Sequence, residues 1–238
     1  MRPLALICFV LVAASLAAQG RGGAPRAVAL RATFIGNEAW HITDGEYTLL
    51  TDFPYQSGYS GYMRWEWSKV PGVPSPSKLL IVTTHQHRDH FAAELLPRFN
   101  PGGVIGPASV RDAAGSAGIA PGPEGRFGPI TVQAIPTPHA NLEHYSYVLE
   151  WHGVRLYLPG DTEDTASLTA ARDLDVAFVT SWMLRAVERL GATIPARRII
   201  VVHHEAGADI PPYQGSTVPR QGEVLQLEHS TITAPAPR

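Results

Sequence analysis

The sequence predicts an α/β fold in a single domain that spans residues 28–228. Its 238 residues are enough for one domain with a buried core, and a hydrophobic content of 45% with only 17% charged residues is typical of a globular protein. Short apolar runs recur along the chain, and several end in a histidine or an aspartate, which is typical of a site at one edge of a sheet. The formal net charge is −2 and no basic run is present, so the composition argues against nucleic-acid binding.

Residues 1–18 have the layout of a secretory signal peptide. The apolar stretch inside them is shorter than the roughly 20 residues that a membrane-spanning helix needs. The small residues Ala17 and Ala18 close it, so we expect cleavage after one of them and a linker over residues 19–27; an uncleaved membrane anchor is the alternative. The mature protein would be periplasmic or secreted, without stable membrane association. It would also lack thiolate ligands and disulfides, because Cys8 is the only cysteine.

The first half of the domain is predicted to open with a meander of strands. The predicted strands cover residues 28–34, 39–42, 48–51, 79–82 and 103–105. Gly45 lies between two of them, where a hairpin turn is expected. The run at residues 79–82 is continuously apolar, as in a strand that is buried on both faces. Apolar spacing over residues 91–99 predicts a short helix that Pro97 and Asn100 close.

The second half alternates further strands with short helices. The predicted strands cover residues 130–135, 145–151, 154–158, 175–180, 198–202 and 222–227. His152 and Gly153 separate two of them as a two-residue hairpin turn. One short helix is expected before residue 130, and residues 181–190 are predicted to form an amphipathic helix. Residues 229–238 are predicted to be a disordered tail.

Residues 53–77 combine many aromatic side chains with glycine, proline and serine and show no clean periodicity, which predicts a surface loop. Long loops in compact domains are disproportionately functional. The aromatic residues of this loop either line a substrate cleft or pack together as a small local core; they are Tyr55, Tyr59, Tyr62, Trp65 and Trp67. Arg64 offers a cation in the middle of the loop.

Four potential metal ligands follow the apolar run at residues 79–82, in the order H-x-H-x-D-H. They are His85, His87, Asp89 and His90. Imidazole nitrogens and carboxylate oxygens suit Zn²⁺, Mn²⁺ or Fe, and so many polar groups in one loop are costly unless a cation offsets their crowding. Two of the histidines are two residues apart on a nearly extended chain, so their side chains can point to the same side. The cluster therefore predicts a metal site.

Three later polar residues occupy the same kind of position, immediately after a short apolar run. They are His139, Asp161 and His203. Because the strands before them can end at one edge of a sheet, these side chains can converge with the first cluster.

This order of ligands resembles that of the metallo-β-lactamase fold superfamily: H-x-H-x-D-H, a lone histidine, a Gly-Asp-Thr turn, and a late histidine after an apolar strand. The resemblance covers nearly the whole mature chain, and its most specific parts are the first cluster and the turn at Gly160, Asp161 and Thr162. It implies a four-layer αββα sandwich and a dinuclear metal site. The metal ions would be divalent, with Zn²⁺ expected first and Mn²⁺ or Fe as alternatives.

The resemblance also implies how the ligands divide between two ions. His85, His87 and His139 would hold one ion, Asp89, His90 and His203 the other, and Asp161 would bridge both. Two neighbours compete for these roles: His144 with His139, and His204 with His203. We favour His139 because it directly follows the strand, and His203 because the next residue of a turn can face the cleft instead.

Departures from the superfamily pattern narrow the branch. Asp161 stands where well-known lactamases have a cysteine ligand, and the stretch from Ala140 to His144 lacks the Thr-Pro-Gly-Ser run of glyoxalase-like members. Together with Asp52 at the end of an early strand, this is more similar to the branch of ascorbate-6-phosphate lactonase and the tRNA 3′-processing nucleases. The predicted export and the lack of a basic arm argue against a nuclease.

The resemblance implies hydrolysis by a metal-bridging hydroxide, which Asp89 would orient and from which it would accept a proton. We expect a lactone, ester or amide of a small molecule as substrate, partly apolar and with one negative charge near Arg64. The residues predicted to contact it are Arg64, Trp65, Tyr55 and His204. The alternatives are a phosphodiesterase, an iron-dependent oxidoreductase and a metal-binding protein without catalysis.

Overall fold

The computed structural model of the chain describes residues 29–57, 63–72, 75–211 and 213–229. The predicted signal peptide and linker, Tyr59 and Tyr62, and residues 230–238 of the predicted tail lie outside the described residues. His229, the first residue of that tail, is held against the domain, because its Nδ1 lies 3.2 Å from Oδ2 of Asp175. Among the described residues, no helix combines the length and the apolar character that crossing a membrane requires.

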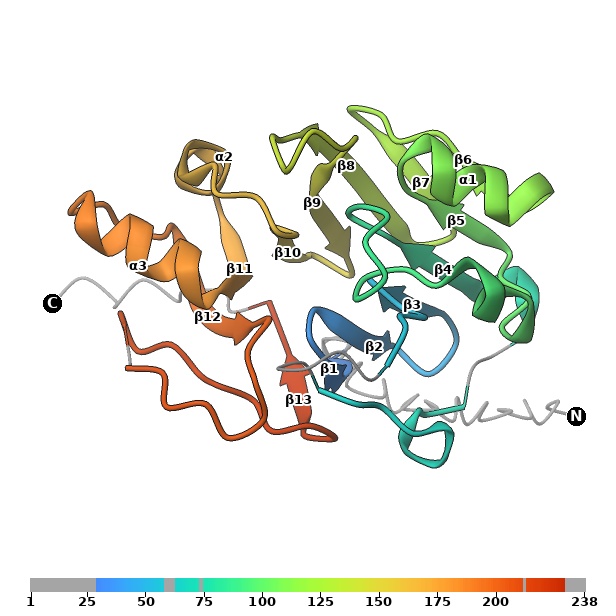
Figure 1. Cartoon of the computed structure of the whole chain (residues 1–238), viewed down its shortest axis with the longest axis horizontal. Coiled ribbons are helices and arrows are strands. Elements are labelled where there is room, and N and C mark those ends of the chain that lie inside the picture. The colour runs from blue at the N-terminus through green and yellow to red at the C-terminus, as the bar shows by residue number, and fades with distance from the viewer. Residues whose placement is uncertain (1–28, 58–62, 73–74, 212, 230–238) are drawn as a thin grey trace, which may run out of the picture.

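Two mixed sheets form the centre of the domain (Figure 1). The first has the order β13-β1-β2-β3-β4-β5-β6, and its strands are β1 (Leu30–Gly36), β2 (Ala39–Thr43), β3 (Thr48–Thr51), β4 (Leu79–Val82), β5 (Gly103–Ile105), β6 (Gly118–Ile119) and β13 (Val224–Leu227). The second has the order β12-β11-β10-β9-β8-β7, and its strands are β7 (Gly125–Phe127), β8 (Ile130–Pro136), β9 (Tyr145–Trp151), β10 (Val154–Leu158), β11 (Leu174–Thr180) and β12 (Ala196–Val202).

Apolar residues on both faces of these sheets create three buried clusters and therefore four layers. Successive side chains of a strand point to opposite faces, so Leu80 and Val82 of β4 join the core between the sheets while Leu79 and Ile81 join the outer cluster. The helices α2 (Thr165–Ala170) and α3 (Ser181–Arg189) cover the outer face of the second sheet. The predicted αββα sandwich is confirmed.

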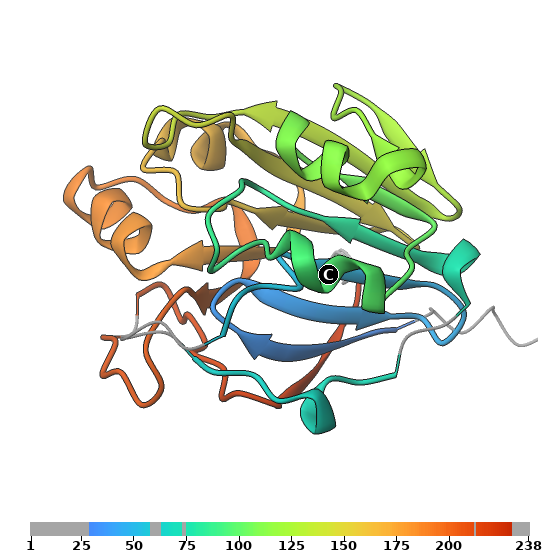
Figure 2. The ribbon, with the colours of Figure 1, turned by 45° about the vertical axis from the view of Figure 1, so that its right-hand side comes forward.

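The outer layer on the first sheet contains little regular helix. It consists of α1 (Ala108–Ala114), the 3₁₀ turn η3 (Ala93–Arg98) and the described part of the aromatic loop, which all contribute to the outer apolar cluster on the first sheet (Figure 2). The helix predicted over residues 91–99 is thus a shorter 3₁₀ segment. Pro97 lies inside it and has no N–H to donate to an α-helical hydrogen bond. The backbone instead forms hydrogen bonds between residues three apart, as in the bond that the N–H of Phe99 donates to the carbonyl of Leu96 at 3.0 Å.

Most strand predictions are confirmed, several at their predicted bounds, as for β3, β5, β9 and β10. The sequence analysis missed α2, β6 and β7, which are short and lack a periodic apolar pattern; in α2 only Leu168 is buried. Three further 3₁₀ turns, η1 (Trp67–Lys69), η2 (Pro76–Lys78) and η4 (Gly115–Ala117), lie in segments that had been expected to be irregular.

Candidate metal centre

One edge of the sandwich collects polar residues that directly follow strands. Strands β3 and β4 are parallel neighbours in the first sheet, as are β10, β11 and β12 in the second, so their carboxyl ends share this edge. The residues that the strand ends place there are Asn37 and Glu38 after β1, Asp52 after β3, His85 to His90 after β4, His139 after β8, Asp161 after β10, Trp182 after β11 and His203 after β12. This is the edge at which α/β sheets bind ligands.

A first group of ligand atoms comes from His85, His87, His139 and Asp161, and all of these atoms lie within 4.8 Å of one another. Nε2 of His85 is 2.9 Å from Nδ1 of His87, and Nε2 of His139 is 3.3 Å from the same Nδ1. A neutral imidazole has one N–H and one lone pair, so three facing ring nitrogens cannot all be satisfied by hydrogen bonds among themselves. A cation between them would accept every lone pair at once.

The orientation of His85 is fixed by a relay of hydrogen bonds from Asp52. Oγ1 of Thr84 lies 3.0 Å from Oδ2 of Asp52 and 3.0 Å from Nδ1 of His85, and the Thr84 backbone N–H donates to Oδ1 of Asp52 at 2.7 Å. The hydroxyl has one proton, which the carboxylate accepts, so the hydroxyl oxygen accepts from Nδ1–H of His85. This leaves the lone pair of His85 on Nε2, which faces the other ligands.

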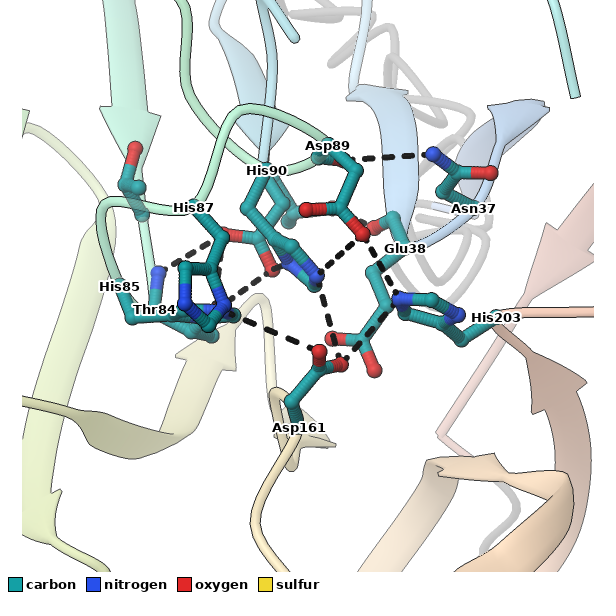
Figure 3. Close-up of polar contacts among 12 residues, drawn as sticks. Asn37, Glu38, Thr84, His85, His87, Asp89, His90, Asp161 and His203 are labelled. Atoms are coloured by element: carbon teal, nitrogen blue, oxygen red, sulfur yellow. Dashed lines mark hydrogen bonds and ion pairs between the residues drawn. The ribbon is translucent and has the colours of Figure 1, made fainter. Parts of the chain in front are cut away.

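A second group consists of Asp89, His90, Asp161 and His203 (Figure 3). Oδ1 of Asp161 lies 3.3 Å from Nε2 of His90 and 3.3 Å from Nε2 of His203, and Oδ2 of Asp89 lies 3.3 Å from the latter nitrogen. Oδ2 of Asp161 lies 3.8 Å from Nε2 of His85 in the first group. The carboxylate of Asp161 therefore stands between the two groups, in the position the sequence analysis gave it.

Asn37, in the turn between β1 and β2, links the backbone around this second group. Its Nδ2 donates to the carbonyl of Asp89 at 3.3 Å, and its own carbonyl accepts from the N–H of His203 at 2.8 Å. Its Oδ1 accepts from the N–H of Met63 at 3.2 Å. Asn37 is not among the residues predicted for the site, although it follows an apolar strand in the same way as the predicted ligands.

The charges of the ligand residues suit a cation. Burial lowers the pKa of His85 and of His139, so both imidazoles are neutral with a free lone pair. Burial works against ionisation of Asp161, but the positive charge and hydrogen bond of His90 outweigh it and hold the Asp161 pKa below its usual range. Burial likewise disfavours the imidazolium of His90, yet Asp161 and Asp52 raise its pKa well above the usual value. Metal binding would have to displace that proton.

The residues therefore fit two divalent ions with nitrogen and oxygen ligands. Two groups of ligand atoms share one carboxylate, and seven residues are too many for one tetrahedral ion. No sulfur takes part, which agrees with Zn²⁺, Mn²⁺ or Fe. Residues that orient the ligands are present as well, since Nδ1 of the ligand His90 lies 3.2 Å from Oδ2 of Asp52.

Glu38 is a second buried carboxyl group beside Asp52 and His90, and the three residues form a further group of potential ligands. Its side chain is 4% exposed, and Oε1 has no hydrogen-bond partner among the described residues. Burial raises the pKa of Glu38 well above its usual range, which favours the neutral form of this acid beneath the site. The pattern that could have found Glu38 is its place just after β1, within Gly36-Asn37-Glu38.

The two competing histidines have other environments. His144 belongs to neither group; it is buried, its Nδ1 lies 2.8 Å from Oγ1 of Thr137, and burial lowers its pKa to about 3. It packs against Gly160, where an added Cβ would collide with its Nε2. His204 stacks on Phe34 with ring centroids 5.8 Å apart and lines a separate pocket beside Met63 and Gln221. The predicted contact of His204 with substrate is therefore not at the metal groups.

The structure corrects the prediction that Tyr55 and Trp65 line the cleft. Tyr55 is 0% and Trp65 9% exposed, and both join the outer apolar cluster on the first sheet. Nε1 of Trp65 donates to the carbonyl of Tyr55 at 2.8 Å, and the two rings pack on Phe53. These aromatic residues form the local core that was the alternative interpretation, because burying large rings is more favourable than exposing them. Arg64 is exposed, and its carbonyl accepts from Nε2 of Gln221 at 2.7 Å.

The cleft beside the ligands has different walls from those expected. A cavity of about 680 Å³ is lined by Pro138, His139, Ala140, Asp161, Glu163, Asp164 and Trp182. Trp182 is the second residue of α3, and its ring meets that of His203 edge to face at a centroid distance of 4.9 Å. The sequence analysis missed Trp182 and Glu163, since neither belongs to a ligand pattern.

Comparison with known proteins defines the class. Residues 31–180 match a family model described as a β-lactamase superfamily domain, which covers more than half of the chain. The protein therefore belongs to the β-lactamase superfamily, as its motifs predict. The predicted fold of this superfamily is confirmed as well.

Among individual proteins, the chain is 38% identical over 82 residues to a hydroxyacylglutathione hydrolase-like protein of Bos taurus; the match covers 34% of this chain and 42% of that relative, so the chain spans less than half of its length. Igni18, a metallo hydrolase of Ignicoccus hospitalis, has the same fold with a TM-score of 0.61 at 15% identity, over 85% of this chain and 100% of that one. The metallo-β-lactamase fold protein YhfI of Bacillus subtilis gives 0.57 at 14% identity, over 83% and 99%.

Proposed function

We propose that the protein is an exported, dinuclear metal-dependent hydrolase that cleaves a lactone, ester or amide of a small molecule. The observation that carries this proposal is the convergence of two ligand groups on the shared carboxylate of Asp161, beside an open cavity of about 680 Å³. That volume lies within the range of small-molecule sites. The choice of a lactone or a related acyl compound rests on the resemblance to the lactonase branch.

When bound, divalent ions would supply a water that is acidic enough to ionise near neutral pH and a Lewis acid for the carbonyl oxygen. The chain contributes orientation and proton transfer. His203 and His90 hold the pKa of the Asp89 carboxyl below its usual range despite burial, so Asp89 is an acceptor for the proton of the attacking water. In the hydrolysis, the oxygen of the attacking water would bond to the acyl carbon while the bond from this carbon to the leaving oxygen or nitrogen breaks, and Asp89 would pass the proton to the leaving group.

Export is part of the proposal, and it rests on residues 1–18. Expression of the whole chain in a bacterium, followed by mass spectrometry of the periplasm and medium, tests it. We expect a chain that begins after Ala17 or Ala18. An intact N-terminus in the cytoplasmic fraction would contradict export without affecting the assignment of the metal site.

The central experiment combines metal analysis of the purified protein with a panel of substrates. The panel contains lactones, carboxylic esters, amides, phosphodiesters and, because of the bovine relative, a hydroxyacylglutathione thioester. We expect two zinc ions per chain and turnover of the acyl compounds. Preferential turnover of phosphodiesters would favour the phosphodiesterase alternative, and an iron site that absorbs visible light and consumes oxygen would favour redox chemistry. Metal binding without any turnover would refute the proposed reaction.

A further inference from the structure

The cleft has an acidic and aromatic rim. Besides the ligands His139 and Asp161, its lining consists of Pro138, Ala140, Glu163, Asp164 and Trp182. Among the described residues that line it there is neither lysine nor arginine. The rim therefore offers negative charge and an aromatic ring, and no side chain that would pair with an anion.

Glu163 is the carboxylate of this rim that is available to bind a ligand. Asp164 is engaged as the N-cap of α2, since its Oδ1 accepts the N–H of Ala166 at 3.0 Å. Glu163 is exposed and makes neither a hydrogen bond nor an ion pair with any residue that the structure describes. A carboxylate in this state can pair with a ligand without first breaking another interaction.

Trp182 contributes an aromatic ring to the lining of the same cleft. Thr180 caps α3 by accepting the N–H of Met183 at 3.3 Å, which sets the start of the helix at Ser181. The indole is half-buried, and its ring and that of His203 meet edge to face with their centroids 4.9 Å apart. An indole and a carboxylate that line one cleft can together recognise an ammonium group, because the ring quadrupole and the negative charge attract the same cation.

We propose that the substrate carries a cationic group, a quaternary or primary ammonium, which Trp182 and Glu163 hold while the scissile carbonyl lies at the metal ligands. This inference rests on the proposed function and names its substrate class: a cationic ester, lactone or amide. It replaces the sequence-based expectation of an anionic substrate, since Arg64 is not among the residues that line the cleft.

The test uses three 4-nitrophenyl esters with the same spacer between the carbonyl and the terminal group. They are the esters of 4-(trimethylammonio)butanoate, of the neutral isostere 5,5-dimethylhexanoate, and of glutarate, which ends in a carboxylate. We expect kcat/KM to be about tenfold higher for the cationic ester than for the neutral one, and lowest for the anionic ester. Equal values for all three, or a preference for the glutarate ester, would overturn the inference.

Variants test whether the preference for the cationic ester arises from Glu163 and Trp182. Glu163→Gln should reduce the preference for the cation by roughly threefold, and Glu163→Lys should favour the anionic ester. Trp182→Leu should weaken the preference while Trp182→Phe keeps part of it. Glu188→Lys is the matched control, because Glu188 is an exposed carboxylate on α3 that lines a different pocket. If Glu188→Lys and Glu163→Lys change the ratios equally, the effect is long-range and the assigned site is wrong.

A binding measurement separates failure of this inference from failure of the proposed function. Calorimetry of the metal-free protein compares 4-(trimethylammonio)butan-1-ol with the neutral 5,5-dimethylhexan-1-ol. Tighter binding of the cation, lost in Glu163→Lys, supports the rim as an ammonium site even if no ester is hydrolysed. Stronger or equal binding of the neutral alcohol refutes it even if all three esters are hydrolysed.

Discussion

Replacement of Asp161 by asparagine tests the shared carboxylate most directly. The side chain keeps its size but loses its charge, and its oxygens contact ligands of both groups, at 3.3 Å from Nε2 of His90 and of His203 and at 3.8 Å from Nε2 of His85. Three ligands remain on each side. We therefore expect the fold to persist, while both ions bind more weakly and most of the hydrolytic activity is lost.

The size of the loss follows from ligand energetics. Removing an outer partner of a metal ligand typically costs 10–100-fold in affinity, so removing the bridging ligand should cost at least about 100-fold, or about 2.7 kcal/mol per ion. At a fixed metal concentration the stabilisation by each ion falls by the same amount. For a domain of this size the rise in Tm caused by metal should shrink by about 5–10 °C per ion.

Elemental analysis, calorimetric metal titration and thermal unfolding with and without metal measure this effect. Asp164→Asn is the control, because it removes a carboxylate from the same loop while asparagine still caps α2. If the Asp161 variant binds two ions with the affinity of the wild type and keeps the full rise in Tm, Asp161 is only a turn residue and the dinuclear assignment is wrong.

Three further predictions concern stability and pH. Trp65→Ala should lower the free energy of unfolding, measured by urea denaturation, by about 3–5 kcal/mol and leave the metal content per folded chain unchanged. Trp67 is 44% exposed, so Trp67→Ala should lower it much less. A larger loss for Trp67→Ala than for Trp65→Ala would restore the assignment of Trp65 to the cleft. Gly160→Ala should weaken metal binding in titrations, because the new Cβ would meet His144 and Thr84 at a φ of +62°, and unchanged affinity would contradict this packing. The metal-free protein should lose stability as the pH is lowered from 6.5 to 5. Five of the described histidines have a pKa lowered from 6.5 in the fold, so the unfolded chain takes up their protons first; these are His41, His85, His139, His144 and His204. His90 and Glu38, whose pKa values are raised, contribute in the opposite direction, and stability that rises on acidification would show that they dominate.

Local patterns explain which parts of the structure could be predicted. The strand at Leu79–Val82 could be predicted because a strand buried on both faces must be continuously apolar. The hairpin at His152 and Gly153 could be predicted because two residues separate two strands there; both adopt a positive φ, of 52° and 79°, as such turns require. The ligand loop that follows Leu79–Val82 could be predicted as well, since four potential ligands lie within six positions. Short elements such as α2 carry too few buried residues to leave a pattern.

Side chains whose role depends on distant segments could not be assigned in this way. Asn37 and Glu38 belong to the site because β1 ends at the same edge as β4 and β12. Trp182 reaches His203 because β11 and β12 are parallel neighbours, which brings the start of α3 beside the end of β12. Nothing in the local sequence around these residues states which strands will be neighbours.

The sequence by itself determined the class of fold, the family and the metal-ligand types, because ligand spacing and the apolar runs before each ligand are local properties of the chain. The tertiary structure decided which of two nearby histidines faces the other ligands, that Tyr55 and Trp65 are core, and that Glu163 and Trp182 border the cleft. These outcomes depend on which segments, distant in the sequence, pack against one another and bury the side chains between them. Burial and proximity are properties of the packed molecule, and they set both the charges of the ligands and the chemistry of the cleft.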